Sequence, residues 1–125
     1  MSVTSSRKRP LSPHLQIYRW EINMTTSILH RMSGSVLAVG TVLVAWWLLA
    51  LANGPDTFAA AQDCLTSPLG LVFLFGWSAA LCFHFFSGIK HLLMDIGLFF
   101  SVPGMRLASY AVIGLAAVLL ALIWI

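Results

Sequence analysis

The chain has 125 residues, of which 59% are hydrophobic and only 9% are charged, with a formal net charge of +3. A soluble domain carries about 25% charged residues because its surface faces water, so much of the surface of this chain must face lipid instead. The composition therefore excludes a secreted disulfide scaffold, a disordered tail and an ordinary cytosolic enzyme.

The polar N-terminal segment, residues 1–26, is predicted to lie in the cytoplasm. Most of the Lys and Arg residues of the chain fall in its first quarter, at Arg7, Lys8, Arg9, Arg19 and Arg31. No basic face extends through the rest of the sequence, so this cluster indicates membrane topology rather than nucleic-acid binding. The segment does not resemble a cleavable signal peptide, because it is polar, contains Pro10 and Pro13, and is followed by no cleavage pattern.

Three uncharged apolar runs follow, at 32–55, 65–89 and 107–125, and each is predicted to cross about 30 Å of hydrocarbon as the core of a longer helix. Asn53-Gly54-Pro55 ends the first helix, Ser67-Pro68 supplies an N-cap and a first-turn proline for the second, and Val102-Pro103-Gly104 separates the second from the third. The predicted fold class is all-α, an integral membrane protein with three transmembrane helices. Its predicted segments are a first transmembrane helix at 27–53, an outer loop at 54–67, a second helix at 68–97, a cytoplasmic turn at 98–104 and a third helix at 105–125.

The charges in the loops predict the orientation of these helices. Five cations precede the first uncharged run, none lies in the loop at 54–67, and Lys90 and Arg106 flank the second turn. The positive-inside rule then places the N-terminus and the second turn in the cytoplasm, and the C-terminus in the periplasm. A bacterial inner (plasma) membrane is the predicted location.

The second predicted helix carries ionisable side chains at membrane depth, where their cost usually marks a function. His84, Gly88, His91 and Asp95 lie within about 60° of one another on a helix that turns about 100° per residue. A neutral imidazole beside a glycine is suited to bind haem iron, because the missing side chain leaves room for the porphyrin. The alternative is a histidine that only bonds a carbonyl on an adjacent helix. His84 and His91 cannot both ligate one iron, since about 10.5 Å of helix separates them.

The first predicted helix begins with a second polar group. Ser27, Arg31 and Gly34 share one face, and His30 lies beside it. A hydroxyl and a guanidinium one turn apart are suited to hold a carbonyl, a carboxylate or a lipid phosphate. The alternative is a helix-capping serine and an arginine that extends to the lipid headgroups. Because the second helix runs back toward the cytoplasm, its last polar residues are expected to approach this group.

Three segments of the chain resemble the signatures of one family. They are Arg9–Tyr18 (RPLSPHLQIY), Ser27–Gly34 (SILHRMSG) and His84–Asp95 (HFFSGIKHLLMD). The family is that of the cytochrome b subunit of succinate dehydrogenase, the membrane anchor of respiratory complex II in its three-helix form. The resemblance covers nearly the whole chain. One difference is Lys90, where many relatives carry arginine; the charge is kept but bidentate geometry is lost.

The resemblance implies an anchor that binds haem b and quinone, and that helps to pass electrons from succinate through iron–sulfur clusters to ubiquinone. The implied partners are a flavoprotein subunit, an iron–sulfur subunit, membrane lipid and a second small anchor against which the three helices would pack. The chain would be an enzyme subunit without succinate chemistry of its own. The alternatives are a quinol:fumarate reductase anchor and a non-catalytic membrane scaffold without haem.

The resemblance also implies roles for individual residues. His84 matches the axial ligand of haem b, whose second ligand would come from the sister anchor. Ser27 and Arg31 match quinone-pocket residues, and His30 and Arg31 match residues near the haem propionates. No residue of this chain matches a catalytic group.

Three further polar residues complete the candidate set. His91 is a candidate neighbour of the haem or its propionates, and Asp95 is a candidate for a proton path. A purely structural role explains both equally well. His14, in a segment bracketed by prolines, is given no catalytic role.

Overall fold

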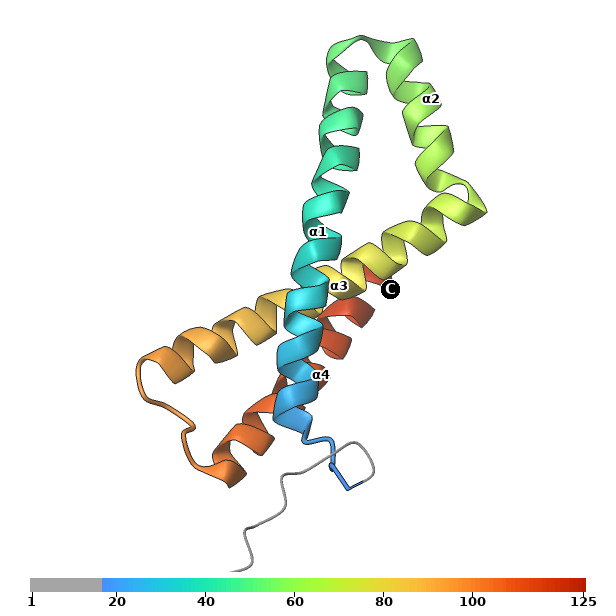
Figure 1. Cartoon of the computed structure of the whole chain (residues 1–125). Helices are drawn as coiled ribbons and strands as arrows, with labels where there is room; N and C mark the ends of the chain where they lie inside the picture. Colours follow the sequence, from blue (N-terminus) through green and yellow to red (C-terminus); the bar gives the residue numbers. More distant parts are fainter. Residues whose placement is uncertain (1–16) are drawn as a thin grey trace, which may run out of the picture.

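A computed structural model describes residues 17–125 of the chain; His14 and most of the first motif lie outside the described residues. The described part contains no strand and four helices, α1 (Ile22–Ala52), α2 (Pro55–Thr66), α3 (Pro68–Asp95) and α4 (Val102–Trp124), shown in Figure 1. Helices α1, α3 and α4 are each long and apolar enough to cross a membrane. The predicted all-α class with three membrane spans is therefore confirmed.

Helix α3 is the central element, because both α1 and α4 pack against it. Figure 1 shows α1 crossing α3 near the middle of both helices, while α2 leads from the far end of α1 to the start of α3. Gly40 lies where α1 faces Trp77 of α3, and a Cβ at this position would overlap the indole ring. The close approach of the two helices therefore depends on a glycine at position 40.

Apart from Lys90, the buried residues of the described chain are small, while most large apolar side chains are exposed. This distribution is typical of membrane helices, which approach one another through small residues and turn larger ones to lipid or to other subunits. The buried apolar residues are Ala50, Ala61, Cys82, Ala108, Val112 and Ala116. The buried polar residues are Thr26, Ser33, Ser87, Lys90 and Ser109.

The helix ends follow local capping rules. Ser67 caps α3, its Oγ accepting a hydrogen bond from the Gly70 amide at 3.1 Å with Pro68 in the first turn, as predicted. Helix α1 runs from Ile22 to Ala52, so it begins five residues before, and ends one residue before, the expected bounds of 27–53. Helix α4 begins earlier than expected, because Ser101 is its N-cap. The segment 102–104, expected to separate two helices, is therefore the first turn of α4.

Helix α2 occupies most of the segment at 54–67 that was expected to be a loop. Gly54 has a φ of 111°, which lets the chain turn sharply after α1, and Pro55 then starts the new helix. Asp56 in its first turn is favourable next to the helix dipole. The Thr57 hydroxyl donates to the Ala50 carbonyl at 2.8 Å, which ties α2 to the end of α1.

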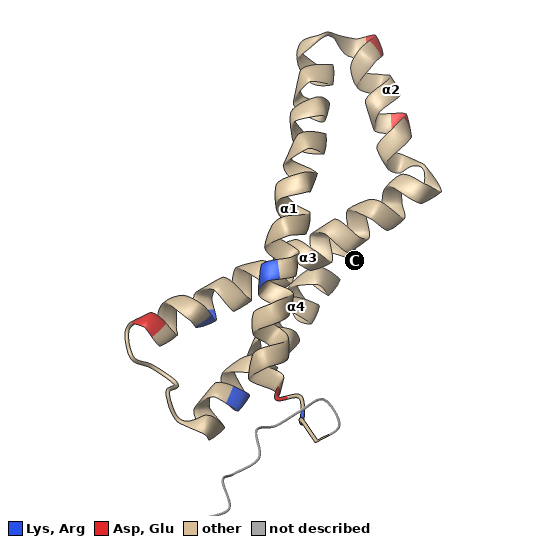
Figure 2. Cartoon of the chain, in the orientation of Figure 1, with Lys and Arg blue, Asp and Glu red and all other residues tan. Residues whose placement is uncertain are grey.

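The charged residues of the described chain are divided between α2 at one end of the molecule and the part of the molecule away from α2. Figure 2 shows acidic residues on α2, an uncharged upper half of α1, and the remaining charged positions in the lower half of the molecule. There Arg106, in the first turns of α4, donates three hydrogen bonds to the Glu21 carboxylate, with an ion-pair distance of 2.8 Å. This pair links the start of α1 to the start of α4. It contributes little to stability, because both side chains are half exposed.

Candidate functional site at the crossing of α1 and α3

Three histidine rings lie face to face where α1 crosses α3. The ring of His30 on α1 is stacked on that of His84 on α3, with 4.1 Å between centroids and 11° between planes. Its other face is stacked on His91, at 4.8 Å and 21°. The structure therefore brings together three of the candidate residues, with His30 between two histidines that lie two turns apart on α3.

The hydrogen bonds of His84 fix which of its ring nitrogens is free. Its Nδ1 lies 3.1 Å from the carbonyl oxygen of His30 and 3.1 Å from Oγ of Ser33. Because a carbonyl can only accept, Nδ1 carries the proton and Nε2 keeps its lone pair. This is the usual arrangement of a histidine that binds a metal through Nε2 and is oriented through the other nitrogen.

His84 has both the room and the free nitrogen that a ligand of haem iron would need. A Cβ at Gly34 would lie 3.0 Å from Cε1 of His84, so the glycine gives the ring its room against α1. His84 does bond a carbonyl of the neighbouring helix, as the alternative expected, but this bond involves Nδ1 only. Carbonyl bonding and iron binding are therefore compatible, because they use different nitrogens. Within residues 17–125 no three His, Cys, Asp or Glu side chains meet as ligands for a bare metal ion.

Ser27 and Arg31 lie one turn apart on α1. The N-cap of α1 is Glu21, so Ser27 is in the second turn and the helix-capping alternative is wrong. Ser27 is half-buried and Arg31 is exposed. Within residues 17–125 the only ion pair joins Arg106 to Glu21, so the guanidinium of Arg31 is left for a ligand or for lipid.

The remaining candidates lie toward the end of α3. His91 shares a hydrogen bond of 2.7 Å between its Nδ1 and the Ser87 carbonyl of the same helix. Asp95 is the last residue of α3 and is exposed, one turn beyond His91. Nδ1 of His30 is buried without a hydrogen-bond partner in the described chain. The stack thus contains a polar atom that no neighbour within residues 17–125 satisfies.

Lys90 is buried between three helices. Its side chain is 5% exposed, and Nζ donates to Thr26 Oγ1 of α1 at 3.0 Å and to Ser109 Oγ of α4 at 3.2 Å. Ser109 Oγ in turn donates to Oδ1 of Asn23 at 2.8 Å. No carboxylate in residues 17–125 forms an ion pair with Lys90. These four residues, the lysine network, join α1, α3 and α4 through neutral partners.

Replacing Thr26 by valine is expected to destabilise the assembled protein by about 1–3 kcal/mol, because a buried ammonium loses an acceptor. The thermal unfolding midpoint of the detergent-solubilised complex measures the effect. Thr25→Val is the matched control, since Thr25 Oγ1 bonds only the Glu21 carbonyl of the same chain end.

Adding Lys90→Met to Thr26→Val is expected to recover most of that loss, because both polar partners are then absent. A Thr26→Val protein as stable as Thr25→Val would contradict the role of the lysine network. So would a double variant that is less stable than Thr26→Val alone.

Two features of this region were not assigned from the sequence. The role of Lys90 was left open, although a single cation in a long apolar helix is itself a signal of buried polar partners. Ser33 was quoted in a motif but given no role. Thr26, His30 and Ser33 are spaced i, i+4 and i+7, and this spacing places all three on the face of α1 that meets α3.

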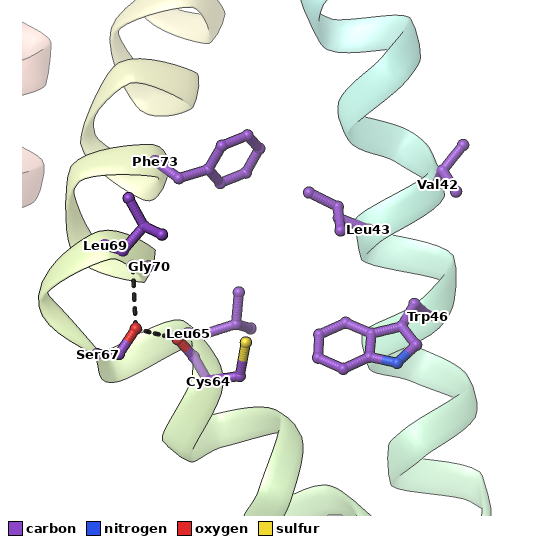
Figure 3. A pocket seen from close by; sticks show the side chains of 9 residues that line it. All are labelled: Val42, Leu43, Trp46, Cys64, Leu65, Ser67, Leu69, Gly70 and Phe73. Carbon is purple, nitrogen blue, oxygen red and sulfur yellow. Dashed lines mark hydrogen bonds between the residues drawn. The ribbon is translucent and has the colours of Figure 1, made fainter.

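An apolar cavity of about 780 Å³ lies apart from the histidines, between α1 and the junction of α2 with α3 (Figure 3). Leu43 of α1 and Phe73 of α3 face each other across it. The Ser67 hydroxyl in its wall already donates to the Cys64 carbonyl at 2.6 Å and accepts from the Gly70 amide. Without a charged side chain, this cavity suits a hydrocarbon chain and offers nothing to hold a polar headgroup.

Known proteins match this chain over nearly its whole length. Residues 5–123 match the family described as succinate dehydrogenase/fumarate reductase transmembrane subunit. The succinate dehydrogenase cytochrome b556 subunit of Paracoccus denitrificans is 39% identical over 119 residues, which cover 95% of this chain and 92% of that protein. The subunit of the same name from Rickettsia prowazekii is 35% identical, with 94% and 92% covered. The mitochondrial succinate dehydrogenase cytochrome b560 subunit of Mus musculus is 36% identical, with 90% and 68% covered.

Proposed function

This chain belongs to the family of succinate dehydrogenase and fumarate reductase transmembrane subunits, and from that premise we propose that it is the haem b- and quinone-binding anchor of a succinate dehydrogenase. The family inferred from the three motifs is thus confirmed, and so is its nature as a multi-pass membrane protein. The observation that carries the proposal is the His84 ring. Its Nδ1 is held by the facing helix, so its Nε2 is left to bind iron.

In this proposal, His84 would hold the haem iron through Nε2, and the sister anchor would supply a second ligand. Bound there, haem b would supply reversible one-electron chemistry. His30 and Arg31 offset the negative charge of the propionates, since donors and cations stabilise buried carboxylates. His91 stacks on His30 and keeps that ring in place against His84.

Ser27 and Arg31 would hold the headgroup of ubiquinone. The Ser27 hydroxyl donates a hydrogen bond to a quinone carbonyl, and the Arg31 guanidinium polarises the same end of the ring. Both groups stabilise the negative charge that this oxygen gains on reduction. Asp95, exposed at the end of α3, is the proposed start of a proton path from water. The chain therefore orients the acceptor and performs no chemistry on succinate.

The proposed assembly contains a flavoprotein subunit, an iron–sulfur subunit and a second small anchor. The large apolar side chains exposed on the described helices need lipid or another subunit to cover them. The proposed location is a bacterial inner membrane, with the N-terminus cytoplasmic and the C-terminus periplasmic, because the acidic helix α2 and the cations lie toward opposite ends.

Purification of the tagged chain from native membranes tests the function. A flavoprotein and an iron–sulfur protein are expected to co-purify, a dithionite-reduced minus oxidised spectrum should show a b-type band, and succinate should reduce ubiquinone. Intact partners without a b-type band would favour a haem-free scaffold. Fumarate reduction by quinol that is faster than succinate oxidation would favour the fumarate reductase alternative.

A further inference from the structure

We propose that Ser33 is a positioning residue that tunes the iron-binding nitrogen of His84, an inference that rests on the proposed haem site. Ser33 is 8% exposed on α1. Its Oγ lies 3.1 Å from Nδ1 of His84 on α3 and donates to the His30 carbonyl at 2.9 Å. The hydroxyl therefore contacts both the histidine and the carbonyl that orients it.

The direction of these hydrogen bonds defines what Ser33 does. Its proton is directed to the His30 carbonyl, so the lone pairs of Oγ remain to accept from Nδ1 of His84. Nδ1–H is then shared between two acceptors, the carbonyl and the hydroxyl. Hydrogen bonds accepted from this N–H increase the electron density that the imidazole gives to a metal through Nε2. Ser33 thereby favours the oxidised iron and lowers its reduction potential.

Ser35 shows that this role is not shared by serines on α1 in general. Its Oγ bonds only the Arg31 carbonyl one turn back on the same helix, at 3.2 Å, and the residue is exposed. Such a bond to the local backbone is the ordinary behaviour of serine inside a helix. Ser33 also makes a local bond, but its oxygen contacts His84 on α3 as well. The two serines differ in that one contact, so they form a matched pair.

The test uses the purified holo-complex of wild type, Ser33→Ala and Ser35→Ala. Potentiometric titration of the b-type band gives the haem midpoint potential, and low-temperature EPR of the oxidised iron reports the strength of the axial ligand. Ser33→Ala is expected to keep most of its haem per flavin, to raise the midpoint potential and to shift the low-spin EPR signal. Ser35→Ala is expected to match wild type in both measurements.

Two further variants separate hydrogen bonding from packing. Ser33→Thr restores a hydroxyl and is expected to return the potential toward that of wild type, whereas Ser33→Cys, with similar volume and a weak acceptor, is expected to behave as Ser33→Ala. If Ser33→Ala loses haem altogether, restoration by threonine and not by cysteine supports the proposal. Restoration by cysteine would assign Ser33 to packing and overturn it.

A His84→Leu complex separates failure of this inference from failure of the proposed function. Where His84→Leu lacks haem and Ser33→Ala has the wild-type potential and EPR signal, only the role of Ser33 is overturned. Where His84→Leu keeps its haem, the assignment of the ligand is overturned, and the role of Ser33 with it.

Discussion

Replacing His84 by leucine is expected to remove the b-type absorption band from the membrane complex. Leucine occupies a similar space but offers no nitrogen. Loss of a residue that merely orients a metal ligand costs about 10–100-fold in affinity, so loss of the ligand itself should lower the affinity for haem by at least that much and reduce the haem-to-flavin ratio. Dithionite-reduced minus oxidised optical spectra, recorded at equal flavin content, measure the change.

His91→Leu is the control for disturbance of the histidine stack. His91 stacks on His30 and takes no part in the hydrogen bonds of His84. This variant is therefore expected to keep its haem. A band that survives in His84→Leu would move the ligand to His30 or His91. A band lost equally in both variants would mean that the stack, and not one nitrogen, retains the haem.

Replacing Ser27 by alanine is expected to lower kcat/KM for ubiquinone by about ten- to a hundredfold while haem content stays at the wild-type level. The proposed hydroxyl donates to an oxygen that gains negative charge on reduction, and donors of this kind contribute most when that charge develops. Steady-state reduction of ubiquinone by succinate gives the ratio. Oxidation of succinate with a soluble dye, which bypasses the membrane site, should be unchanged.

Ser35→Ala is the control for Ser27→Ala, because it removes the same group from the same helix at a position where the hydroxyl bonds the local backbone. Its ubiquinone kinetics are expected to match wild type. Wild-type kinetics in Ser27→Ala would remove Ser27 from the quinone site. A Ser27→Ala complex that loses haem would show that the quinone and haem sites are not separate.

Local chemistry predicts much of the fold. The long uncharged runs identify α1, α3 and α4, because a charged residue inside lipid is costly. Ser67 followed by Pro68 marks the start of α3, because both residues favour a helix N-terminus in their own right. Helix α2 was not predicted, because the search for long uncharged runs cannot find a short helix with charged residues. With 12 residues and two acidic side chains, it lacks the apolar length that identifies a membrane span.

The unpredicted parts depend on contacts between distant segments. The polar start of α1 was assigned to the segment before the membrane, but Thr26 is buried because Ser109 and Lys90 pack onto it. Helical periodicity placed His84 and His91 on one face of α3. The same periodicity does not predict the angle and depth at which α1 crosses that face. This crossing places His30 between His84 and His91.

The length of α1 sets the depth of its polar residues relative to the lipid. A helix of 31 residues is about 46 Å long, against about 30 Å of hydrocarbon. A typical tilt of about 20° shortens its projection only slightly, so one end must extend past the hydrocarbon. Asn23 and Thr25 make the N-terminal end the polar one, whereas α1 is apolar as far as Ala52 at the other end. Ser27 then lies at headgroup level, where bulk water can deliver the protons that the proposed quinone reduction consumes.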